Sequence, residues 1–78
     1  MKSFTISEML PESAIEVAMV IGRDIGSADT SAIVGRLERE VVAPNMAEIN
    51  RRTGQENDAR YMAYAVYYAL SQASRSAT

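Results

Sequence analysis

The sequence predicts an all-α fold: a small bundle of three to four helices in one domain over residues 1–78, with the middle helix broken or kinked at Pro44. Three observations predict it. Apolar side chains recur every three to four residues in successive segments, which is the period of an amphipathic helix. Glycine or proline separates these segments. A chain of 78 residues is also too short for two independent cores.

The first ten residues predict an N-terminal arm. Phe4 and Ile6 alternate with hydroxyl residues, which is compatible with an edge strand or an extended arm. A helix is then predicted from Pro11, because proline suits the first helical position, where its missing N–H costs nothing. We expect Gly26 to close this helix as its C′ residue. The predicted apolar stripe consists of Ala14, Ala18, Ile21 and Ile25.

A second helix follows and is expected to change direction at Pro44. Its candidate N-caps are Ser27, Asp29 and Thr30. Its apolar stripe consists of Ile33, Val34, Leu37 and Val41. A further apolar group, rotated by about 100–140° on the helical wheel, consists of Val42, Met46 and Ile49. One straight helix cannot bury both groups on one neighbour, so a break at Pro44 is predicted, and Gly54 ends the segment.

The last helix is apolar nearly all round. Asn57 or Asp58 is its predicted N-cap, it runs to about residue 73, and residues 74–78 are expected to be a frayed tail. One side holds Met62, Ala65, Val66, Ala69 and Leu70. Much of the other side holds Tyr64, Tyr67 and Tyr68, with Tyr61 at the border. We expect the first side, and Met62, Val66, Ala69 and Leu70 in particular, to face the core.

The four tyrosines are candidate partner-binding residues. A chain this small has few elements with which to cover both sides of its last helix. Tyrosine is enriched at interfaces, where its ring is buried and its hydroxyl remains in contact with water. The interface predicted is with a second copy, with a foreign protein, or with both. The alternative is a core helix whose tyrosine rings are half-buried with their hydroxyls in water.

Arg51, Arg52 and Arg60 are the other candidate partner-binding residues. They flank the turn at Gly54 between two predicted helices, where arginine could meet a protein partner or, less favourably, DNA. Two acids, Glu56 and Asp58, stand where DNA phosphates would lie. The structural alternative is a solvated helix C-terminus, where arginine suits the helix dipole.

Composition argues against catalysis. The chain has no histidine and no cysteine, which removes the commonest general base and the thiolate ligands. Glu12 and Glu16, four residues apart, indicate a solvated acidic face. No enzyme activity, no cofactor and no metal site are therefore expected.

Charge and hydropathy bear on partners and location. Eight basic against ten acidic residues give a formal charge of −2, which is too weak for a basic nucleic-acid footprint. The longest apolar run, residues 61–70, is about half of what a bilayer span needs. The chain is expected to be cytoplasmic, in the host cytoplasm if phage-encoded. Neither nucleic acid nor a membrane is expected as a partner.

Two family resemblances bear on function. Residues 33–42, IVGRLEREVV, resemble in texture the small phage-encoded anti-CRISPR proteins, especially those against type I systems. That resemblance implies a protein that occupies a surface of a CRISPR effector complex or of its nuclease.

The layout also resembles the small helical regulators of enteric bacteria linked to biofilm and acid resistance. The resemblance is carried by residues 12–15 (ESAI), 22–24 (GRD), 36–38 (RLE) and the closing helix from Asn57. It implies a homodimer that docks on other regulatory proteins. The expected function is thus a non-enzymatic protein-binding inhibitor or adaptor. The alternative is a dimeric stress or biofilm regulator. A third and less favoured hypothesis is contact with DNA.

Overall fold

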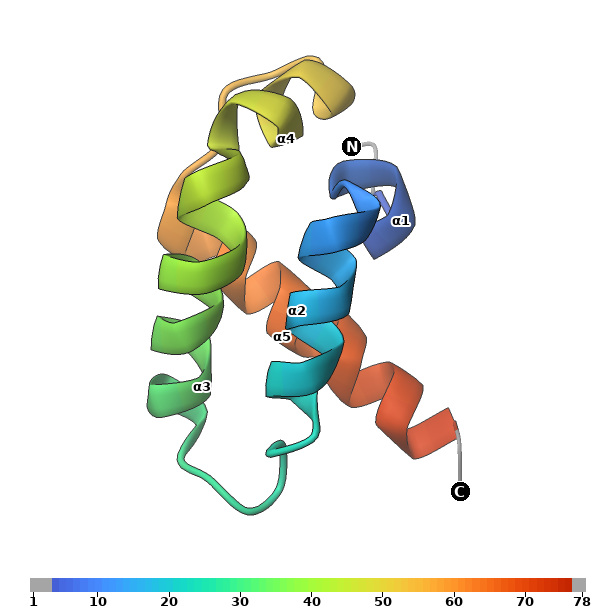
Figure 1. Ribbon diagram of the computed structural model, residues 1–78, viewed down its shortest axis with the longest axis vertical. Coiled ribbons are helices and arrows are strands. Elements are labelled where there is room, and N and C mark those ends of the chain that lie inside the picture. The colour runs from blue at the N-terminus through green and yellow to red at the C-terminus, as the bar shows by residue number, and fades with distance from the viewer. Residues whose placement is uncertain (1–3, 77–78) are drawn as a thin grey trace.

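The computed structural model describes residues 4–76, and it confirms the predicted all-α fold (Figure 1). The helices are α1 (Ile6–Met9), α2 (Glu12–Gly22), α3 (Thr30–Leu37), α4 (Met46–Thr53) and α5 (Ala59–Ser76). α2 stands beside the run from α3 to α4, and α5 crosses behind both. The described residues form no strand, only one isolated bridge between Ile25 and Ala28. No helix among them is long and apolar enough to cross a bilayer.

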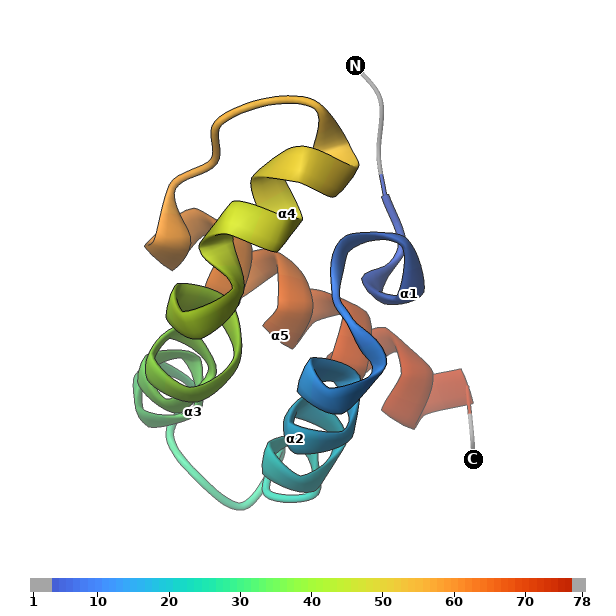
Figure 2. The ribbon, with the colours of Figure 1, turned by 45° about the horizontal axis from the view of Figure 1, so that its top comes forward.

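The edge strand or extended arm expected at Phe4 and Ile6 is wrong, because Thr5 starts a helical turn instead. The Thr5 backbone N–H donates to Glu8 Oε1 at 2.8 Å, and the Glu8 N–H donates to Thr5 Oγ1 at 3.3 Å. This capping box outweighs the alternation of apolar and polar residues. The turn buries Met9, and α1 packs against α4, as Figure 2 shows. Residues 1–3 of the predicted arm lie outside the described residues.

α2 begins one residue later than predicted and also ends earlier, before the predicted stop at Gly26. Pro11 is its N-cap rather than its first residue, and the helix stops at Gly22 instead of reaching Gly26. The backbone N–H groups of residues 23–25 bond to carbonyls three residues back, so the chain tightens into turns. Gly26, at φ +99°, lies in the connection to α3. Ile25 therefore leaves the predicted stripe and is only half-buried, whereas Ala14, Ala18 and Ile21 are buried.

The break at Pro44 is confirmed. α3 passes into a π-helical turn, Glu38–Val42, then a 3₁₀ turn, Ala43–Asn45, before α4 begins (Figure 1). Proline has no N–H for the regular helical bond, so the ladder is interrupted here. The side-chain amide of Asn45 donates to the Val41 carbonyl at 2.7 Å. Both apolar groups thereby enter the core: Val41, Val42 and Ile49 are buried, and Met46 is half-buried against them.

The predicted ends of α3, α4 and α5 are largely confirmed. Asp29 stands at the N-cap of α3, although its side chain makes no cap hydrogen bond to the backbone. Gly54, at φ +72°, ends α4 in the left-handed conformation that glycine tolerates. Asp58 caps α5, because its Oδ2 accepts the Tyr61 N–H at 2.9 Å. α5 continues to Ser76, past the predicted end, and residues 77–78 of the predicted tail lie outside the described residues.

The core side of α5 agrees with the prediction at most positions. Met62, Val66 and Leu70 are buried as expected, whereas Ala65 and Ala69 are only half-buried. Ala63, which the wheel did not single out, is fully buried. α5 packs against α3, the π-helical turn and α2, so three neighbours cover a wide sector of it. The opposite sector of α5 is the outer surface of the molecule.

Candidate functional site

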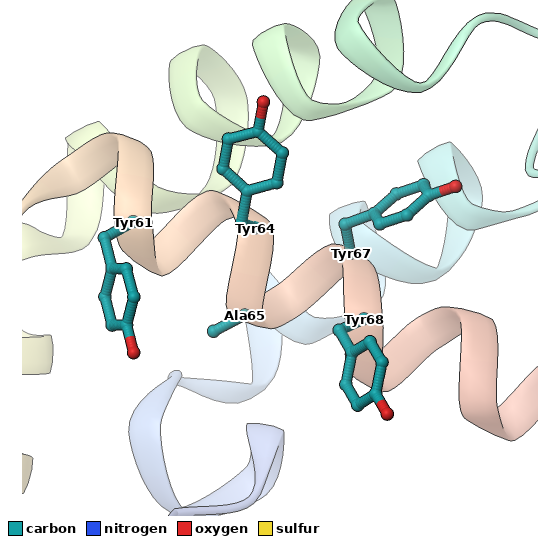
Figure 3. A pocket seen from close by; sticks show the side chains of 5 residues that line it. All are labelled: Tyr61, Tyr64, Ala65, Tyr67 and Tyr68. Atoms are coloured by element: carbon teal, nitrogen blue, oxygen red, sulfur yellow. The ribbon is translucent and has the colours of Figure 1, made fainter.

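Four tyrosines and one alanine form a continuous surface on the outer side of α5, here called the tyrosine face. Its members are Tyr61, Tyr64, Ala65, Tyr67 and Tyr68, and they line an open hollow of about 510 Å³ (Figure 3). Tyr61, Tyr64 and Tyr68 are 68%, 46% and 65% exposed. Sequence reasoning placed Ala65 on the core side, so its role in this surface was missed.

The rings stand on both sides of a low floor. Figure 3 shows Tyr61 and Tyr68 pointing to one side of α5, Tyr64 pointing to the other, and Ala65 between them. Tyr61 and Tyr68 are seven residues apart, so they lie two turns apart on the same side of the helix. The methyl group of Ala65 is the smallest side chain of the set. The hollow therefore has aromatic walls and an alanine floor.

Tyr67 differs from the other three because it is tied to the rest of the fold. Its ring is half-buried against the core, and its hydroxyl lies 3.2 Å from Thr30 Oγ1 at the start of α3. This tyrosine thus matches the structural alternative of a half-buried ring with a polar tip. Tyr61, Tyr64 and Tyr68 are the exposed members of the tyrosine face.

No charge interrupts the tyrosine face. The sequence from Tyr61 to Ala73 contains no aspartate, glutamate, lysine or arginine. A centre rich in aromatic residues and free of charge is typical of the buried part of a protein–protein interface. Exposed aromatic rings in this setting have the composition of a contact surface.

Of the three candidate arginines, Arg60 is the one that lies on α5, next to the tyrosine face. Its Nε donates to Glu38 Oε1 at 2.5 Å, which joins α5 to the π-helical turn. This hydrogen bond raises the pKa of the Arg60 guanidinium, and the neighbouring Tyr64 hydroxyl adds a smaller effect in the same direction. A charged group thus borders the face while remaining neutralised within the chain.

Arg51 and Arg52 lie on α4 and share one carboxylate. Arg51 Nε donates to Glu48 Oε1 at 3.1 Å, and Arg52 Nε donates to Glu48 Oε2 at 2.6 Å. These bonds, that from Arg51 foremost, lower the pKa of Glu48 to about 2. Arg52 also donates from Nη1 to the Leu10 carbonyl at 2.9 Å, which fastens α4 to the turn between α1 and α2. The structure therefore does not bring these two arginines onto the helix that carries the tyrosines.

A second group of exposed apolar side chains lies on α2. Val17, Met19 and Val20 are 39%, 58% and 53% exposed. The sequence signal for them is simple, because all three fall off the predicted apolar stripe of their helix. These exposed positions, away from the tyrosine face, are suitable for matched control substitutions.

The remaining sequence features form no further site. Glu12 and Glu16 are both exposed on α2, as expected for a solvated face. Over residues 4–76, no three acidic side chains come together in an arrangement that could hold a metal ion. Comparison of the chain with protein-family models, with curated proteins and with solved structures finds no match.

Proposed function

We propose that this chain is a non-enzymatic inhibitor or adaptor that acts by binding another protein through the tyrosine face. The observation that carries the proposal is the set of three exposed tyrosines around Ala65 on a charge-free stretch of α5. Burying such rings against a partner gains apolar contact, while the hydroxyls keep hydrogen bonds at the edge. α5 is anchored by its opposite side, so the rings are presented on a rigid support.

The energetics favour a few dominant contacts. Truncation of a tyrosine in the centre of an interface typically costs about 2 kcal/mol or more, which is roughly thirtyfold in affinity. Arg60, beside the face and already paired with Glu38, suits the rim of such an interface. DNA binding is less favoured, because Arg51, Arg52 and Arg60 each have a carboxylate partner within the chain.

The anti-CRISPR resemblance supplies a defined partner for the test. This partner is a purified type I CRISPR effector complex, since the resemblance implies a protein that occupies a surface of such a complex. The decisive variant carries Tyr61→Ser, Tyr64→Ser and Tyr68→Ser together. The matched control carries Val17→Ser and Val20→Ser on α2, which removes exposed apolar side chains elsewhere.

Binding is measured by surface plasmon resonance with the effector complex and by affinity capture from host cells. We expect the affinity of the triple variant for the partner to fall at least a hundredfold, whereas the α2 variant should keep the affinity of the unsubstituted protein. Binding through this face should change little between low and moderate salt, whereas DNA binding falls steeply. A partner that the triple variant retains and the α2 variant loses would overturn the proposal.

A further inference from the structure

We infer that, at high protein concentration, a second copy of the chain covers the tyrosine face of the free protein, with the two α5 helices antiparallel about a two-fold axis between residues 64 and 65. This inference rests on the proposed function of the face as a protein-binding surface. It adds what occupies the face before a partner arrives, and it makes release of the second copy a step in partner binding.

The spacing of the rings indicates that the occupant is a helix. Tyr61, Tyr64 and Tyr68 follow one another at intervals of three and four residues, which is the spacing of a coiled-coil seam. They are exposed on a helix whose other side is packed in the core. A seam of this kind is filled by side chains from a second helix lying along the first.

Symmetry selects the antiparallel arrangement. A two-fold interface joins the same patch on both copies, so residues at equal distances from the axis meet. With the axis between residues 64 and 65, Tyr64 meets Ala65 of the second copy, and Tyr61 meets Tyr68 of the second copy. The ring of Tyr64 then fills the space above the alanine floor. A parallel pair would set Tyr64 against Tyr64 and leave the hollow above Ala65 empty.

The charges permit this pairing. Residues 61–73 carry none, so no like charges oppose one another along the seam. Arg60 lies just outside this segment and donates a hydrogen bond to Glu38 of its own chain. The dimer therefore does not leave the Arg60 charge buried without a partner.

The area available makes the dimer weak. A tyrosine buries about 150–250 Å², so the exposed parts of the three rings amount to roughly 270–450 Å² per copy. Two copies together bury roughly 540–900 Å² of ring surface, below the lower bound of about 1,200 Å² for a stable interface. The second copy therefore dissociates readily, and a partner with a larger contact surface displaces it.

Sedimentation velocity of the full chain tests this, at concentrations from about 10 µM to about 1 mM. We expect a reversible shift from monomer to dimer across this range. Tyr64→Glu places like charges near the axis and should leave the protein monomeric, whereas Val20→Glu on α2 should dimerise as the unsubstituted chain does. Circular dichroism verifies that both variants are folded.

A charge pair tests the orientation. In the antiparallel register, a variant with Tyr61→Lys and Tyr68→Glu sets each lysine against a glutamate of the second copy, so it should still dimerise, and less strongly as salt rises. In a parallel pair the same variant sets like charges together and becomes monomeric. Monomeric unsubstituted protein at all concentrations, a monomeric Val20→Glu variant, or a monomeric double variant would each overturn the inference. The unsubstituted protein could be monomeric at every concentration while the triple serine variant still loses its partner. That result would support the proposed function and rule out the dimer.

Discussion

Gly22 on α2 lies directly against Leu70 on α5: a Cβ atom at residue 22 would stand 3.4 Å from Leu70 Cδ1. The two helices cross closely here because one of them has no side chain at the contact. A separation of 3.4 Å is an ordinary van der Waals contact, so an alanine methyl group fits without displacing the leucine. The crossing therefore tolerates one added carbon atom and no more.

Gly22→Ala should stabilise the protein slightly. Residue 22 is helical, and alanine loses less conformational entropy on folding than glycine, so the free energy of unfolding should rise by up to about 1 kcal/mol. Gly22→Val adds branches that collide with Leu70 and should lower the free energy of unfolding by about 1–3 kcal/mol. Urea unfolding followed by circular dichroism measures both, and an alanine variant less stable than the glycine protein would show that the crossing has no room for a methyl group.

Arg52→Ala should destabilise the fold far more than Arg51→Ala. Both arginines bind Glu48, but Arg52 also donates to the Leu10 carbonyl, which the substitution leaves without that donor. A hydrogen bond to a charged group is worth about 1.5–3 kcal/mol, whereas an exposed ion pair is worth about 0–1 kcal/mol. The Arg51 side chain is 69% exposed and serves as the control. Equal melting temperatures for the two variants would contradict this account.

Acid should remove the stabilisation that Glu48 provides. The folded-state pKa of Glu48 is about 2, below its ordinary value of 4.5, because Arg51 and Arg52 bind its charged form. The stabilisation is therefore fully present above about pH 4.5 and is lost as the pH falls through about 2. Glu48→Gln should melt below the unsubstituted protein at neutral pH, and the difference should close near pH 2. A difference that stays constant with pH would refute the assignment.

Leu70→Ala and Tyr61→Ala should separate core from surface on one helix. Leu70 is 7% exposed, and its truncation should cost about 2–5 kcal/mol, close to the whole stability of so small a domain. Tyr61 is 68% exposed, and its truncation should change the free energy of unfolding by about 0.5 kcal/mol or less. Thermal melts at low protein concentration, where self-association does not contribute, provide the comparison.

The features predictable from the sequence are those that depend on the spacing of residues close together in the chain. The bend at Pro44 follows from two apolar groups that cannot share one face, and the exposed tyrosines follow from a helix with more apolar surface than a small chain can cover. The capping box of Thr5 and Glu8 was equally local, but the alternation of Phe4 and Ile6 competes with it. Only the burial of Met9 and the packing of α1 against α4 show which signal prevails.

Other features depend on contacts between distant segments. Arg52 finds its backbone acceptor on Leu10, 42 residues away, and no periodicity indicates that bond. Ala63 is buried because three neighbours cover a wide sector of α5, whereas a helical wheel assumes a single narrow stripe. The same helical wheel placed Ala65 on the core side, because the wheel sorts residues by polarity alone. It contains no information about which helices lie next to each position.

The positions of α5 that form the core and those that form its exposed rings do not overlap. Met62, Ala63, Val66 and Leu70 hold the fold, while Tyr61, Tyr64 and Tyr68 project outward. Selection can therefore replace the outward residues one at a time without a stability penalty that would purge the intermediates. A lineage carrying this scaffold is free to exchange one partner for another by a few substitutions on a single helix, and descendants with the same fold are expected to diverge first at these three positions.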